Sequence, residues 1–244
     1  MTLTLGYAPL PTSTLYEDEV HVWLADLDVA ASNSTAPEGI LSPAELARAE
    51  RYLHESDRQH FIAARAILRN LLGTYTETPP QEIIIEHHPN GKPFLQSKSG
   101  IKVLQFNLSH SENITLYAFS WGRQVGVDIE RLRNTVDIES LARRILTYDE
   151  YADFQACAAT HKTQLFYRYW TCKEAIVKAS GGTLNEMSRI AVSPGHGYPA
   201  GWIKMNRGMP SDSWVVREVA PLPGYTAALV AESPVTLSFR TLKL

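Results

Sequence analysis

Alternating hydrophobic and polar residues run through several short stretches of the chain and predict β-strands. The first stretch is residues 20–27, VHVWLADL. The remaining predicted strands cover 83–86, 102–108, 113–119, 123–130, 189–193, 214–219, 225–231 and 235–240. Short polar or glycine-containing separators join the strands between 102 and 130, so we expect these strands to form an antiparallel meander.

Helix-start signals occur in the stretches between the predicted strands. Ser42-Pro43-Ala44-Glu45 offers a serine N-cap, a proline at the first helical position and a glutamate at the third. A similar signal at Ser56 opens a longer helix that we expect to end at Gly73, and Asp137 and Thr147 open two more. The longest predicted helix covers about 162–180, ends at Gly181-Gly182 and buries a seam of Leu165, Tyr169, Cys172, Ile176 and Ala179.

The elements fall into two similar sets, residues 1–121 and 122–244. Each set combines helices with a small antiparallel sheet, which predicts a duplicated α+β architecture. No linker is obvious between the sets, so we expect the two halves to share a tight interface. Interfaces of this kind are favoured ligand sites.

Composition and charge narrow the class of protein. The 244 residues are 44% hydrophobic and 20% charged, which excludes disordered, collagenous and coiled-coil chains. The net charge of −3 excludes a broadly basic nucleic-acid binder. Two cysteines are too few for a disulfide framework, and no apolar run approaches the roughly 20 residues of a membrane span. The N-terminus has no signal-peptide pattern, so we expect a soluble cytoplasmic protein.

Two acidic residues share one face of a predicted strand in Gly126-Val127-Asp128-Ile129-Glu130. Side chains two positions apart on a strand point the same way, so Asp128 and Glu130 converge while the valines and isoleucine fill the core. Oxygen ligands of this kind favour Mg²⁺ or Mn²⁺ over zinc. We expect Gly126 to let a phosphate approach the backbone. The alternative is a solvated strand end that carries two acids.

The longest predicted helix adds a second pair of charged residues. Glu174 and Lys178 lie four positions apart and therefore meet on one helix face, away from the apolar seam. Read functionally, Glu174 is a third metal carboxylate beside a lysine that faces phosphate. Read structurally, the two form an ordinary surface pair.

Phosphate-binding side chains are also present in the first half. In Phe106-Asn107-Leu108-Ser109-His110-Ser111, a histidine stands between two hydroxyls, although a turn with local serine hydrogen bonds is the alternative. Arginine forks suit phosphate, although a basic stripe is more often a solvated helix face. The basic residues in question are Arg48, Arg51, Arg58, Arg65, Arg69 and Lys92.

The order of these motifs carries more information than any one of them. NGKP at 90–93, FNLSHS at 106–111, GVDIE at 126–130 and WTCKEAIVK at 170–178 follow one another within about 90 residues. From about Ser42 to Leu184 the sequence resembles the Sfp-type 4′-phosphopantetheinyl transferases. The resemblance implies a pseudo-dimer of two α+β halves with the active site between them. It also implies transfer of the phosphopantetheine arm of coenzyme A to a carrier-protein serine, with 3′,5′-ADP as the by-product.

The resemblance also implies roles for individual residues. The implied Mg²⁺ ligands, with Mn²⁺ as an alternative ion, are Asp128, Glu130 and Glu174. The residues that match coenzyme A phosphate contacts are Lys92, Ser109, His110 and Lys178, with Arg48, Arg51 and Arg65 as further candidates. The residues implied in catalysis are Glu150 as general base, Lys178 and Glu174. Glu150 is also the third helical residue after Thr147, so capping is its alternative role, and Lys178 or a metal-bound water are alternative bases.

The implied partners are coenzyme A and an apo carrier protein of the acyl, peptidyl or aryl type, which leaves fatty-acid, polyketide and nonribosomal-peptide pathways open. We expect the carrier to dock on a basic rim near the Arg48–Arg69 helices or in an apolar groove. We expect no nucleic acid, no membrane and a monomer. The alternatives are a Mg²⁺-dependent phosphohydrolase or nucleotidyl transferase, a coenzyme A-binding protein without catalysis, and the short, trimeric holo-carrier synthase group, whose chains are about half as long.

Overall fold

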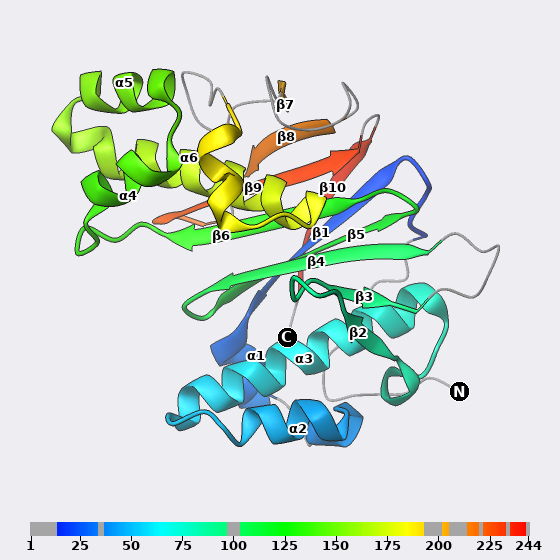
Figure 1. The fold of residues 1–244 in the computed structure, drawn as a ribbon. Helices are drawn as coiled ribbons and strands as arrows, with labels where there is room; N and C mark the ends of the chain where they lie inside the picture. The colour runs from blue at the N-terminus through cyan, green and yellow to red at the C-terminus, as the bar shows by residue number, and fades with distance from the viewer. Residues whose placement is uncertain are drawn as a thin grey trace.

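Two four-stranded sheets pack face to face in the computed structural model, and helices cover the outer face of each sheet (Figure 1). The described residues are 14–33, 37–96, 103–192, 202–204, 214–219, 222–232 and 235–242, with the backbone alone for Pro37 and 202–204. The arrangement is therefore a four-layer α+β fold of two halves, which confirms the predicted fold class. Among the described helices, none is long and apolar enough to cross a membrane.

The first half contains a long helix over a sheet. Its strands are β1 (Glu19–Asp26), β4 (Leu104–Ser111) and β5 (Ile114–Trp121), with a small separate pair formed by β2 (Ile85–His87) and β3 (Pro93–Leu95). Its helices are α1 (Leu27–Asn33), α2 (Pro43–Ala49) and α3 (Glu55–Thr76), with 3₁₀ turns at Pro37–Ile40 and Pro80–Glu82.

The second half repeats this plan. Its strands are β6 (Val125–Arg131), β7 (Trp202–Lys204), β8 (Trp214–Val219) and β9 (Tyr225–Glu232). Its helices are α4 (Ile138–Ile145), α5 (Tyr148–Ala156) and α6 (Ala159–Ser180), followed by a 3₁₀ segment at Leu184–Arg189. The helices α3 and α6, each of 22 residues, are the outer supports of the two sheets.

The last strand, β10 (Thr236–Thr241), returns to the first sheet. The strand orders are β10-β1-β5-β4 and β6-β9-β8-β7, and β10 pairs with β1 in parallel. The first sheet is therefore mixed rather than purely antiparallel, and the chain end ties the two sets of elements together. The division at residues 121 and 122 stays a prediction.

The space between the sheets is filled by apolar side chains from both. Val20, Val22 and Leu116 come from the first sheet, and Val127 and Leu229 from the second. Burying one such side chain contributes about 1.5–3 kcal/mol. Because this face of β6 is apolar, the alternate residues Asp128 and Glu130 lie on the opposite face, as the alternation predicts.

Most helix ends follow the predicted signals. Ser42 with Glu45 and Thr147 with Glu150 form complete capping boxes, Asp137 caps α4, and Gly181 ends α6 in the left-handed conformation.

Several predictions are wrong. The strands between 102 and 130 do not form one meander, because β4 and β5 pair with each other while β6 pairs with β9 in the second sheet. α3 begins at Glu55, without a side-chain cap, rather than at Ser56. Gly73 lies inside α3, because the segment from Thr78 to Pro80 packs against it, and the helix ends at Thr76. The described part of the strand predicted at 189–193 contains only a bridge at Ala191, and the Ile190 carbonyl beside it accepts a hydrogen bond from the Lys173 ammonium.

Candidate active site

Side chains join the edge strands of the two sheets along one line. β4 and β6 are edge strands, and they run in the same direction (Figure 1). Asn107 Oδ1 accepts a hydrogen bond from the Val127 amide, 2.9 Å away, and the Ser109 hydroxyl donates to Asp128 Oδ1 at 2.8 Å. The acids of β6 are therefore fixed at the joint between the halves.

Asp128 is the most buried of the three predicted metal ligands, with 3% of its surface exposed. Its Oδ1 also accepts from the Lys178 ammonium at 2.6 Å. Its Oδ2 is buried and meets no hydrogen-bond donor among the described residues. A buried carboxylate oxygen without a donor is costly unless a cation reaches it.

The carboxylates of Glu130 and Glu174 lie close enough to Asp128 for its negative charge to affect their pKa values. Burial and the neighbouring Asp128 raise the pKa of Glu130, against a 3.0 Å hydrogen bond from the Ser111 hydroxyl. Burial, then Asp128, raises the pKa of Glu174 to about 7. Three neighbouring acids, two of which have raised pKa values, favour a divalent cation among them.

The residues present fit a hard cation by charge and by donor type. Carboxylate oxygens are the ligands that Mg²⁺ prefers, and the Asp128 Oδ2 atom is available. Within the part of the chain that the structure describes, no three His, Cys, Asp or Glu side chains are already gathered as metal ligands. Lys178 supplies the positive charge beside Asp128 in this conformation.

The expectation for Gly126 is wrong. A Cβ atom at this position would collide with the backbone of α6 at Ala175 and Ala179. The missing side chain therefore allows α6 to lie directly on β6, rather than a phosphate. This close contact brings Glu174 and Lys178 over the acids of the strand, because both residues lie on α6.

His110 lies at the end of β4 beside the same group of side chains. It is exposed at the surface, yet desolvation by the surrounding protein lowers its pKa, and Lys178 and His60 lower it further. Ser109, its neighbour, points its hydroxyl to Asp128 and receives the Lys178 ammonium at 3.0 Å. The predicted phosphate contacts Ser109, His110 and Lys178 are thus brought together.

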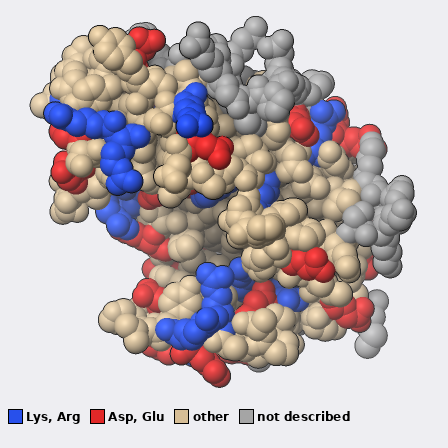
Figure 2. All heavy atoms as spheres, in the orientation of Figure 1, with Lys and Arg blue, Asp and Glu red and all other residues tan. Residues whose placement is uncertain are grey.

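The arginines of the first half form a second group. Arg48 and Arg65 lie over the ring of Phe61, and Arg48 and Arg51 line a cavity of about 460 Å³ with Tyr52. Arg65 Nη1 is buried and meets no acceptor among the described residues. Figure 2 shows a hollow between the surface of α2 and α3 and the surface above it, with Lys or Arg side chains on both sides. Arg69 is structural, since it binds Glu45 and two backbone carbonyls.

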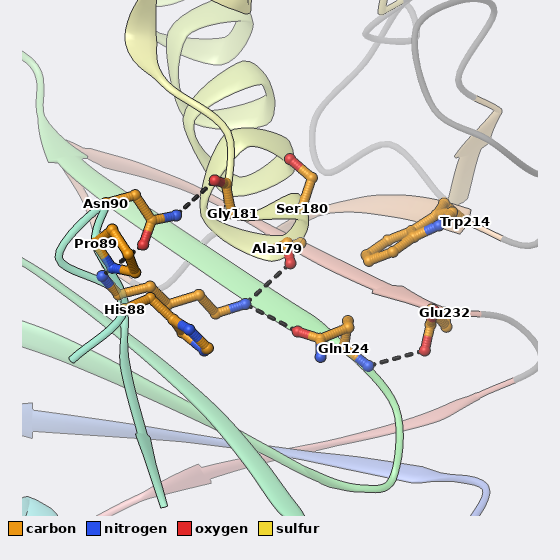
Figure 3. Close-up of a pocket in the computed structure, with 10 residues that line it drawn as sticks. His88, Pro89, Asn90, Gln124, Ala179, Ser180, Gly181, Trp214 and Glu232 are labelled. Atoms are coloured by element: carbon orange, nitrogen blue, oxygen red, sulfur yellow. Dashed lines mark hydrogen bonds between the residues drawn. The ribbon is translucent and has the colours of Figure 1, made fainter. Parts of the chain in front are cut away.

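Lys92 is half-buried and hydrogen-bonded at the joint rather than free in the hollow. Its ammonium donates to Gln124 Oε1 at 3.0 Å and to the Ala179 carbonyl at 2.9 Å, and Figure 3 labels both of these acceptor residues. Burial lowers its pKa to about 8. The residue lines a cavity of about 770 Å³ with Trp214 and Glu232 on one side, and a smaller one of about 230 Å³ with Asn107 and Lys178 on the other.

Glu150 lies apart from this group in its contacts. Its Oε2 is 2.6 Å from the Lys173 ammonium and accepts from the Thr147 amide, while Oε1 accepts from the Val192 amide at 2.8 Å. None of its described hydrogen bonds or ion pairs involves Asp128 or Lys178. Both oxygens of the Glu150 carboxylate therefore have partners in this position, as the capping role predicts.

Three residues of this region have a role that the sequence did not assign to them. Asn107 and Ser111 share the face of Ser109 at alternate positions, and this spacing was a usable signal. Lys173 had no such signal, because only the fold shows that its side chain is fully buried and paired.

The fold and the site together define an enzyme of two α+β halves whose joint gathers acids and cations suited to a phosphate-bearing substrate. Residues 124–229 match the family model of the 4′-phosphopantetheinyl transferase superfamily, and residues 33–121 match that of the 4′-phosphopantetheinyl transferase N-terminal domain. The chain belongs to this superfamily, and it is a transferase that uses coenzyme A to modify carrier proteins.

Relatives extend over most of the chain. The 4′-phosphopantetheinyl transferase HetI of Nostoc sp. is 37% identical over 219 residues, which are 90% of each chain. A putative 4′-phosphopantetheinyl transferase of Synechocystis sp. is 34% identical over 62% of each chain. The 4′-phosphopantetheinyl transferase Sfp of Bacillus subtilis is 26% identical over 59% of this chain and 62% of its own.

Proposed function

We propose that this transferase is Mg²⁺-dependent and accepts carrier proteins of the acyl, peptidyl and aryl types, with 3′,5′-ADP as the second product. The observation that supports the metal is the buried Oδ2 of Asp128, which meets no donor among the described residues and lies beside two further acids. We propose Asp128, Glu130 and Glu174 as the residues that hold the ion, with Mn²⁺ as a substitute. When bound, the ion would neutralise pyrophosphate charge and act as a Lewis acid.

The cationic side chains hold the substrate in this proposal. Lys178 leaves its bond to Asp128 and offers its ammonium to the charge that develops on the departing 3′,5′-ADP oxygen. Ser109, His110 and Lys92 bind coenzyme A phosphates. Lys92 must first give up its hydrogen bonds to Gln124 and to the Ala179 carbonyl. Arg48, Arg51 and Arg65 extend this surface along the hollow.

The carrier serine loses a proton as its hydroxyl attacks the pyrophosphate bond. Glu150 as the acceptor of that proton stays a prediction, and its contacts favour the capping role. Lys178 and a metal-bound water remain the alternatives. A monomer in the cytoplasm is likewise part of the proposal.

The intact mass of an apo carrier protein tests this function. The purified enzyme is incubated with coenzyme A, MgCl₂ and carriers of the acyl, peptidyl and aryl types. We expect each carrier to gain one phosphopantetheine, and we expect no gain with EDTA or with a carrier whose acceptor serine is alanine. Transfer that persists in EDTA would refute the proposed metal dependence. A mass gain by only one carrier type would refute the proposed acceptance of all three types.

A further inference from the structure

The edge of β6 that faces β4 is closed by side chains rather than by a backbone ladder. The amides of Val127 and Arg131 point away from β9 at this edge, and each is accepted by a β4 side chain. Their acceptors are Asn107 Oδ1, 2.9 Å from the Val127 nitrogen, and Ser111 Oγ, 3.0 Å from the Arg131 nitrogen. Alternate residues of β4 therefore bond to β6 and hold the two halves of the molecule together.

Ser111 differs from the other members of this row because it bonds a backbone group and a carboxylate at once. Its oxygen accepts from the Arg131 amide, so its single proton is left for Glu130 Oε2, 3.0 Å away. The side chain is 6% exposed, and water has little access to replace it. The amide thus orients the hydroxyl, and the hydroxyl orients the carboxylate.

We infer that Ser111 is a positioning residue for the Glu130 carboxylate and thereby sets the affinity of the site for its metal ion. The inference rests on the proposed function, since Glu130 is there a metal ligand. Partners that orient a ligand from behind typically change metal affinity about 10–100-fold when they are removed. Ser111 itself touches neither substrate nor metal in this account, and its effect passes through Glu130.

The chain offers a matched control at Ser120. Its hydroxyl is also buried and donates a hydrogen bond to the Glu19 backbone carbonyl at 3.2 Å, and none of its described hydrogen bonds involves Asp128, Glu130 or Glu174. Ser120→Ala therefore removes a buried hydroxyl of similar setting. A general loss of packing or hydrogen bonding would affect the two variants alike.

The experiment compares wild type, Ser111→Ala, Ser111→Thr and Ser120→Ala. Mn²⁺ binding in the presence of coenzyme A is measured by calorimetry, and the Mg²⁺ concentration for half-maximal carrier modification is measured beside it. We expect Ser111→Ala to weaken both about tenfold or more, while kcat at saturating Mg²⁺ stays within about threefold. We expect Ser111→Thr, which keeps the hydroxyl, to recover most of the affinity, and Ser120→Ala to match wild type.

The outcomes separate the inference from the proposed function. Equal metal affinity for Ser111→Ala and Ser120→Ala, with a metal-dependent wild type, would overturn the positioning role alone. A wild type that transfers the arm without a divalent ion would overturn both. Circular dichroism and melting curves confirm that each variant is folded, and Ser111→Thr keeps the comparison decisive where Ser111→Ala is unstable.

Discussion

Helix α6 carries two lysine–carboxylate pairs with the same 2.6 Å separation, Lys178–Asp128 and Lys173–Glu150. In the second pair every polar atom has a partner. The Lys173 ammonium also donates to the Met187 and Ile190 carbonyls, and Glu150 accepts from two amides. Lys173 is fully buried, and the pair connects α5, α6 and the segment that follows α6.

The first pair is incomplete by comparison. The Lys178 side chain is 28% exposed, and Asp128 keeps one buried oxygen without a donor among the described residues. Two neighbouring acids have raised pKa values. The difference teaches that the distance within an ion pair does not reveal its role. The polar atoms that have no partner among the described residues do reveal it, and they indicate that the Lys178–Asp128 pair is the one that binds a ligand.

The largest expected effect comes from the incomplete pair. Asp128→Asn keeps the shape of the side chain and removes its charge, so we expect kcat/KM for carrier modification to fall at least about 10³-fold. Steady-state kinetics with coenzyme A and an apo carrier measure this. Asp137→Asn is the control, because asparagine caps a helix as well as aspartate does, and its rate should match wild type.

The complete pair should instead govern stability. Lys173→Met leaves the Glu150 carboxylate buried without its cation, and we expect the free energy of unfolding to fall by about 3–5 kcal/mol in urea titrations. Lys162→Met breaks the partly exposed pair with Glu139 and should cost no more than about 1 kcal/mol. Similar losses for the two variants would contradict the assigned difference.

A smaller effect is expected from pH in the metal-free enzyme. The folded-state pKa of Glu174, about 7, lies above its ordinary value of 4.5. Between these values the folded protein binds the proton more tightly than the unfolded chain does, so the contribution of Glu174 to stability declines as pH rises through that window. Glu174→Gln cannot ionise. Its melting temperature in EDTA should therefore gain on that of wild type between pH 5 and pH 8, and a constant difference would refute the raised pKa.

Local sequence signals predicted much of the fold. The alternation in β6 placed Asp128 and Glu130 on one face, and the spacing in α6 placed Tyr169, Cys172 and Ile176 in the core. These predictions hold because periodicity and capping depend on residues close together in the chain.

The features that the sequence did not predict depend on contacts between distant segments. Nothing near Thr236 indicates that β10 pairs with β1. The local sequence suggests that Gly126 lets a phosphate approach the backbone. Only the packing of α6 shows that the helix backbone fills the space beside this glycine. Lys92 sits in an ordinary turn, yet the opposite half supplies both acceptors of its ammonium.

The contrast between the two pairs is tested most directly by the rate of Glu150→Gln. Glutamine keeps the capping amide contact with Thr147 but is not a base, so the variant separates structure from proton transfer. The measurement is the single-turnover rate of carrier modification at a temperature where circular dichroism shows the variant folded. We expect a rate within about threefold of wild type. A fall of about 100-fold or more in the folded variant would contradict it and make Glu150 the general base.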